Sequence, residues 1–180
     1  MPRHDTNTDA NDIDRDWREI VAWHDEAEFI GTVAQFLNLD NLRPSFEAYL
    51  EARCDVYPVI EYYTKHGDWR ASDPDAIPDD TYRELRDRMP NAAPNNCYYN
   101  AQTGLLPEVT YCEGYAVNTE FPAVVPHAWV EHGGSVMDIT PTVNAETAEY
   151  FGVAFDNSTV REAMAAREQA DPIVEYVLNE

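Results

Sequence analysis

The first half of the chain has large apolar residues at steps of three and four, the spacing of one face of a helix. The longest stripe predicts one helix, or two with a break near Gly31, and comprises Ile13, Trp17, Ile20, His24, Ala27, Ile30, Ala34 and Leu37. Three shorter helices are predicted after it: one begins near Pro44, one ends at Gly67, and one begins at a Thr81–Glu84 capping box. Residues 67–80, dense in Pro and Asp, are expected to form a loop.

The second half changes to an alternation of period two. Asn95 and Asn96 suit a helix N-cap, so a short helix is predicted from Cys97 to Gly104. The strands predicted after it are 109–117, 123–132, 135–140 and 150–155, and the closing helices are 158–169 and 172–178. Helices followed by a small antiparallel sheet predict an α+β fold.

One domain is expected over residues 13–180, after a disordered acidic tail at residues 1–12. Its predicted parts are a helical part at 13–90, a sheet-bearing core at 95–157 and C-terminal helices at 158–180. Strand 109–117 has one face of small residues, Cys112, Gly114 and Ala116, which would let another element approach closely. We expect the helix that begins at Cys97 to pack there.

The stretch HAWVEHGGSVMDIT, residues 127–140, predicts a tight hairpin with Gly133 and Gly134 as its two-residue loop. That loop sets the predicted pairs His132–Ser135, Glu131–Val136, Trp129–Asp138 and His127–Thr140. His127 and Asp138 then share a face as diagonal neighbours, about 7 Å apart at Cα, within reach of a hydrogen bond between imidazole and carboxylate.

Cys97 supplies a nucleophile to go with this pair. The free N–H groups and the positive dipole end at the start of a helix stabilise a thiolate, and a nearby imidazolium would stabilise it further. A carboxylate behind the imidazole fixes its tautomer and orientation. The sequence therefore predicts a site of Cys97 as nucleophile, His127 as base and Asp138 as the residue that orients the base.

A cysteine that opens a helix, a strand with the pair Gly114-Tyr115, the run HAWVE and then MDIT resemble the transglutaminase-like core of the papain-like thiol enzymes. The resemblance covers residues 95–141 and implies the same roles for Cys97, His127 and Asp138. Family members carry an arginine ahead of the Gly-Tyr pair, where this chain has Tyr111-Cys112-Glu113. Both water and an amine stay open as the acyl acceptor.

The function expected is a cysteine-nucleophile acyl-transfer enzyme, a thiol peptidase or amidase or a transglutaminase-like enzyme, acting on a peptide or amide-type substrate. The expected oxyanion donors are the Cys97 backbone N–H with Asn96 or Asn95. Trp129 is expected to pack over Asp138 and exclude water from the site. The alternative is an inactive transglutaminase-like fold that serves as a binding module, with the helical part holding a protein partner.

Other readings of the polar residues are less favoured. A zinc site from Cys97, Cys112 and His127 lacks the short ligand spacings of such sites, so neither a metal nor another cofactor is expected. Cys54 and Cys112 are expected to be structural. Glu113 is expected to be a solvated carboxylate.

The charge of the chain limits its partners. Lys and Arg number 12 against 34 Asp and Glu, which gives a formal net charge of −22, and Lys65 is the only lysine. A field of this sign repels nucleic acid and anionic membranes, and concentrated salt would screen the self-repulsion. Together with an N-terminus that lacks an apolar run, this predicts a cytoplasmic protein of a high-salt organism. The oligomeric state stays open.

Overall fold

A computed structural model describes residues 41–88, 92, 96–118, 123–140, 147–167 and 170–180. The predicted tail at 1–12 and the helical stripe at 13–37 lie outside these residues. The described residues form a mixed fold of helices and an antiparallel five-stranded sheet, which confirms the α+β prediction. No helix in this part of the chain is long and apolar enough to cross a membrane.

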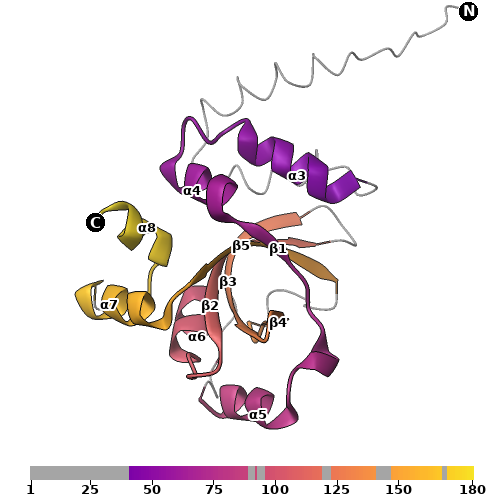
Figure 1. The fold of residues 1–180 in the computed structure, drawn as a ribbon, viewed down its shortest axis with the longest axis vertical. Helices are drawn as coiled ribbons and strands as arrows, with labels where there is room; N and C mark the ends of the chain where they lie inside the picture. The colour runs from indigo at the N-terminus through magenta and orange to yellow at the C-terminus, as the bar shows by residue number, and fades with distance from the viewer. Residues whose placement is uncertain (1–40, 89–91, 93–95, 119–122, 141–146, 168–169) are drawn as a thin grey trace, which may run out of the picture.

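The described helices are α3 (Leu42–Glu51), α4 (Pro58–His66), α5 (Asp79–Arg88), α6 (Cys97–Thr103), α7 (Asn157–Arg167) and α8 (Ile173–Leu178), with a short 3₁₀ helix η2 (Pro74–Ala76). Helices α3 and α4 lie on one side of the sheet, and α7 and α8 lie together on another (Figure 1). Helix α3 contacts α4, α4 contacts α8, and α8 contacts α7, while α6 packs against two of the strands. Helix α5 begins at Asp79 rather than at the predicted Thr81, because Tyr82 N–H already bonds to Pro78 O and Asp79 and Asp80 favour a helix start.

The strands are β1 (Asp68–Arg70), β2 (Thr110–Asn118), β3 (Ala123–His132), β4 (Ser135–Met137) and β5 (Ala148–Phe155). Their order in the sheet is β1-β5-β2-β3-β4, and every neighbouring pair is antiparallel. The four predicted strands are confirmed: β3 has the predicted bounds, β2 and β5 have shifted ends, and β4 ends at Met137 rather than at residue 140. The prediction of a loop over 67–80 is wrong at β1, where three residues pair with β5 although they show no strand pattern of their own.

The sheet curls until its two edges meet. Ala71, directly after β1, forms a bridge with Ser135 of β4, and Val136 N–H donates to Ala71 O at 3.1 Å. Asp73 N–H donates to Ser135 Oγ at 2.7 Å, which ties the same two segments together. The edges therefore have partners, as they do in a barrel.

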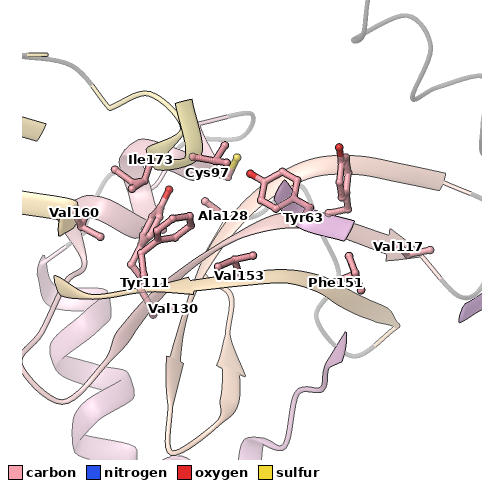
Figure 2. Packing of buried hydrophobic residues seen from close by; sticks show 14 of the residues in the cluster. Tyr63, Cys97, Tyr111, Val117, Ala128, Val130, Phe151, Val153, Val160 and Ile173 are labelled. Carbon is pink, nitrogen blue, oxygen red and sulfur yellow. The ribbon is translucent and has the colours of Figure 1, made fainter. Parts of the chain in front are cut away.

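Two buried clusters lie on opposite faces of this sheet. The larger takes side chains from every described α-helix and from the face of β2 that carries Tyr111, Tyr115 and Val117. Figure 2 shows part of it, with Tyr111 of β2 near Val160 and Ile173 of the C-terminal helices. The smaller lies inside the curl and consists of Cys112, Ala116, Trp129, Val136, Ala148 and Tyr150. Cys97 belongs to the larger cluster, so the expectation that its helix packs on the small face of β2 is wrong.

The small face of β2 instead lets β5 approach. Gly114 lies opposite Gly152 in the β2–β5 register. A Cβ on Gly114 would be 2.2 Å from Phe151 O, and one on Gly152 would be 2.3 Å from Glu113 O and 2.7 Å from the Trp129 ring. Glycine at both positions is therefore what permits the tight curl.

Candidate active site

The tip of the hairpin that carries His127 and Asp138 forms as predicted. Gly133 and Gly134 have φ of 59° and 87°, the left-handed values that a two-residue type I′ turn requires. The predicted pairs His132–Ser135 and Glu131–Val136 are confirmed. The ladder ends at Met137, so Trp129–Asp138 and His127–Thr140 are not ladder pairs, and Asp138 is the first residue beyond β4.

His127 and Asp138 are nevertheless in direct contact. His127 Nε2 lies 2.7 Å from Asp138 Oδ2, and the two side chains are 3% and 1% exposed. Because Nε2 is bonded to the carboxylate, Nδ1 is the ring nitrogen left for another partner.

That partner is Cys97. It is the first residue of α6, which packs on β3, and its side chain interacts with the His127 ring closely enough to raise the pKa of that ring. Cys97 is 8% exposed and shares the larger cluster with Ala128 of β3 and Ile173 of α8 (Figure 2). The three residues that the sequence assigns to one site therefore form one chain of contacts, from Cys97 to His127 to Asp138.

The surroundings favour a charged imidazole. Burial opposes the charge, but the hydrogen bonds to Asp138 and Cys97 and the negative charges of both outweigh it and raise the pKa of His127 to about 9. A pKa in this range favours the imidazolium form at neutral pH. Such a ring beside a cysteine stabilises the thiolate, the nucleophilic form of the side chain.

Three donors hold the carboxylate of Asp138. Oδ1 accepts from Thr140 N–H at 2.9 Å, and Oδ2 accepts from Tyr150 Oη at 2.9 Å as well as from His127. Tyr150 belongs to β5, and the sequence predicted no role for it in the site. It could have been found only from the β2–β5 pairing, which puts it on the same face of the sheet as Gly152 and His127.

Trp129 lies against the imidazole rather than at an open surface. Its ring is nearly parallel to that of His127, with an interplanar angle of 13° and a centroid distance of 6.4 Å. Its Nε1–H donates to Glu131 Oε1 at 3.2 Å, and Glu131 in turn pairs with Arg70 at 3.3 Å. The indole therefore shields His127 from water, and its one donor is already engaged.

The predicted oxyanion residues are only partly described. Asn96 occupies the N-cap position of α6, is exposed and makes no side-chain capping bond. Asn95 lies outside the described residues. The first N–H groups of a helix have no acceptor within it, so the backbone at the start of α6 offers donors next to the Cys97 sulfur.

The other two cysteines have different settings. Cys112 is fully buried in the smaller cluster, away from Cys97, and burial raises the pKa of its thiol far above the ordinary range. Cys54 is partly exposed, and all three cysteines are free. Among the described residues no group of three His, Cys, Asp or Glu side chains is placed to hold a metal ion.

Glu113 is not solvated, so that expectation is wrong. It is fully buried and accepts hydrogen bonds from Tyr111 Oη at 2.6 Å, Tyr63 Oη at 3.3 Å and the N–H groups of Ile173 and Val174, which begin α8. Burial raises the pKa of its carboxyl despite these donors. The polar residue ahead of the Gly-Tyr pair is therefore the anchor of the C-terminal helix, and alternation along one strand did not indicate it.

Neither a family model, a curated protein nor a solved structure matches this chain. The resemblance to the transglutaminase-like core stays a prediction from the residues quoted above.

Proposed function

We propose that the protein is a cysteine-nucleophile acyl-transfer enzyme built on a transglutaminase-like core of the papain-like class. One observation supports this most: a buried imidazole is hydrogen-bonded to Asp138 and also interacts with the Cys97 side chain. The order Cys97, His127, Asp138 along the chain agrees with the resemblance.

The chemistry runs through two steps. The Cys97 thiolate adds to the carbonyl carbon of an amide-type substrate, and the His127 imidazolium gives its proton to the amine nitrogen as the C–N bond breaks. The neutral ring then takes a proton from water, whose oxygen attacks the thioester. The C–S bond breaks, the carboxylic acid leaves, and the thiolate–imidazolium pair is restored. An amine in place of water would give amide transfer.

The site supports each step with a separate group. Asp138 stabilises the imidazolium and holds Nδ1 toward the sulfur. Trp129 keeps water away from the ring, which strengthens the electrostatic contacts inside. The backbone N–H groups at the start of α6 would meet the oxyanion, with the Asn96 side chain as the nearest exposed amide.

Acylation by an activated aryl ester tests the assignment. The background is Cys54→Ser, because Cys54 is partly exposed and would react as well. In that background we expect one acyl group per chain by intact-protein mass, no acyl group after Cys97→Ala, and an unchanged result after Cys112→Ala. Equal acylation of the two alanine variants would remove Cys97 from its role.

The alternative is a binding module that keeps this arrangement without turnover. The observation that favours it is the burial of Cys97, whose 8% exposure leaves little of the sulfur open to a substrate. Alkylation of Cys97 at pH 7 distinguishes the two. A rate at least tenfold above that of a small free thiol favours the enzyme, since the imidazolium maintains the thiolate, and a rate below it favours the module.

A further inference from the structure

The Asp138 carboxylate is shared between two side chains at a single oxygen. His127 Nε2 lies 2.7 Å and Tyr150 Oη 2.9 Å from Asp138 Oδ2. Thr140 N–H occupies Oδ1. Tyr150 therefore competes with His127 for the same lone pairs of the same acid.

The Tyr150 hydroxyl has little freedom to leave this position. The ring is fully buried, with its centroid 5.1 Å from that of Trp129 and 6.1 Å from that of His127. Its backbone pairs with Ala116, two residues from the close approach of Gly114 and Gly152. The tight curl of the sheet thus fixes the distance between the phenol and the carboxylate.

The hydroxyl also remains a donor throughout the working pH range. Burial and the negative charge of Asp138 raise the pKa of Tyr150 well above its ordinary value. A phenol that cannot ionise gives its hydrogen bond to the carboxylate whether His127 is charged or neutral.

We propose that Tyr150 is a positioning residue of this site. It fixes the position of the Asp138 carboxylate relative to His127 and weakens the hydrogen bond between that carboxylate and the imidazolium. When one carboxylate oxygen accepts two hydrogen bonds, each of the two is weaker than a single hydrogen bond to that oxygen would be. The imidazolium therefore gives up its proton more readily to a departing amine than it would without the phenol. This inference rests on the proposed function for its catalytic meaning, but its physical effect on His127 does not.

Tyr150→Phe tests the proposal, with Tyr111→Phe as a matched control. Both tyrosines are fully buried on the sheet and donate to a buried carboxylate, but Tyr111 donates to Glu113 at 2.6 Å on the other face. The readout is the pH titration of the His127 ring in the full chain by NMR, assigned by its absence from a His127→Asn variant. We expect Tyr150→Phe to raise the titration midpoint by roughly half a pH unit or more, and Tyr111→Phe to leave it in place.

A second variant keeps the test independent of general destabilisation. In an Asp138→Asn background, the carboxylate that the phenol acts on is gone, so Tyr150→Phe should no longer move the midpoint. An unmoved or lowered midpoint in Tyr150→Phe alone, or an equal shift in Tyr111→Phe, overturns the proposal. The titration needs no turnover, so a chain that fails the acylation test but shows this shift would refute the enzyme and retain the role of Tyr150.

Discussion

Glu113 and Asp138 are two buried carboxylates on opposite faces of one sheet, and they meet burial in different ways. Glu113 accepts from two phenols and from two N–H groups at the start of α8, all of them neutral donors. Asp138 also accepts from a phenol and a backbone N–H, but its third donor is the ionisable ring of His127. One acid holds the start of a helix, while the other holds an ionisable ring.

The difference shows that burial of an acid does not by itself identify a site. Both carboxylates are buried and both accept several hydrogen bonds, so neither burial nor the number of donors distinguishes them. What separates them is that the partner of Asp138 is an ionisable ring, which also interacts with a third group, Cys97. A buried acid is a better candidate for a chemical site when its hydrogen-bond partner can itself titrate and also contacts a second reactive group.

Removal of the Glu113 carboxylate should have the largest effect on stability. Glu113→Ala leaves the hydroxyls of Tyr63 and Tyr111 and the first N–H groups of α8 without this acceptor, which should cost about 4 kcal/mol. Urea unfolding measures the loss, and Glu113→Gln should lose less because its amide oxygen still accepts. The His127 titration should stay in place, and a Glu113→Ala variant as stable as the parent would end the anchoring role.

Asp138→Asn should act on both stability and chemistry. Loss of the buried charge partner of His127 should cost on the order of 3 kcal/mol and lower the pKa of the ring by about one unit or more. Alkylation of Cys97 at pH 7 should slow with it, because less imidazolium remains to stabilise the thiolate. Urea unfolding, NMR titration and alkylation rate form the set of measurements. If the ring titrates as before, the carboxylate does not control its charge.

The third prediction concerns the dependence of stability on pH. His127 has a folded pKa of about 9, raised above the 6.5 of an exposed ring, so its contribution is fully present below pH 6.5 and is lost as pH rises through 9. The free energy of unfolding should fall by about 3 kcal/mol over that window. Urea midpoints at closely spaced pH values measure it. His127→Gln should flatten the slope, and a slope that persists unchanged would assign it to another group.

The sequence predicted those parts of the structure that depend on local chemistry. Two glycines at a hairpin tip fix the register of the strands on either side, so the contact between His127 and Asp138 follows from a few consecutive residues. The start of α6 at Cys97 and the end of α4 before Gly67 follow likewise from residues near each boundary. Period-two alternation located β2, β3 and β5.

The rest depends on which strands become neighbours. The insertion of β5 between β1 and β2 brings Tyr150 to Asp138, and no residue near Tyr150 signals that partner. The same arrangement turns the small face of β2 into the smaller cluster instead of toward α6. The sequence predicted a solvated Glu113 because its backbone donor, the Ile173 N–H at the start of α8, lies 60 residues further along the chain.

The meeting of Gly114 and Gly152 has a consequence for how this protein tolerates change. A saturation mutagenesis map should mark both glycines as intolerant as the residues of the site, although neither takes part in its chemistry. An alanine at either would push the two backbones apart, since the added methyl would fall within 2.3 Å of a carbonyl oxygen. Tyr150 lies on the same strand as Gly152, and Gly114 is the cross-strand partner of His127. Two positions with no side chain would therefore influence the pKa of the His127 ring.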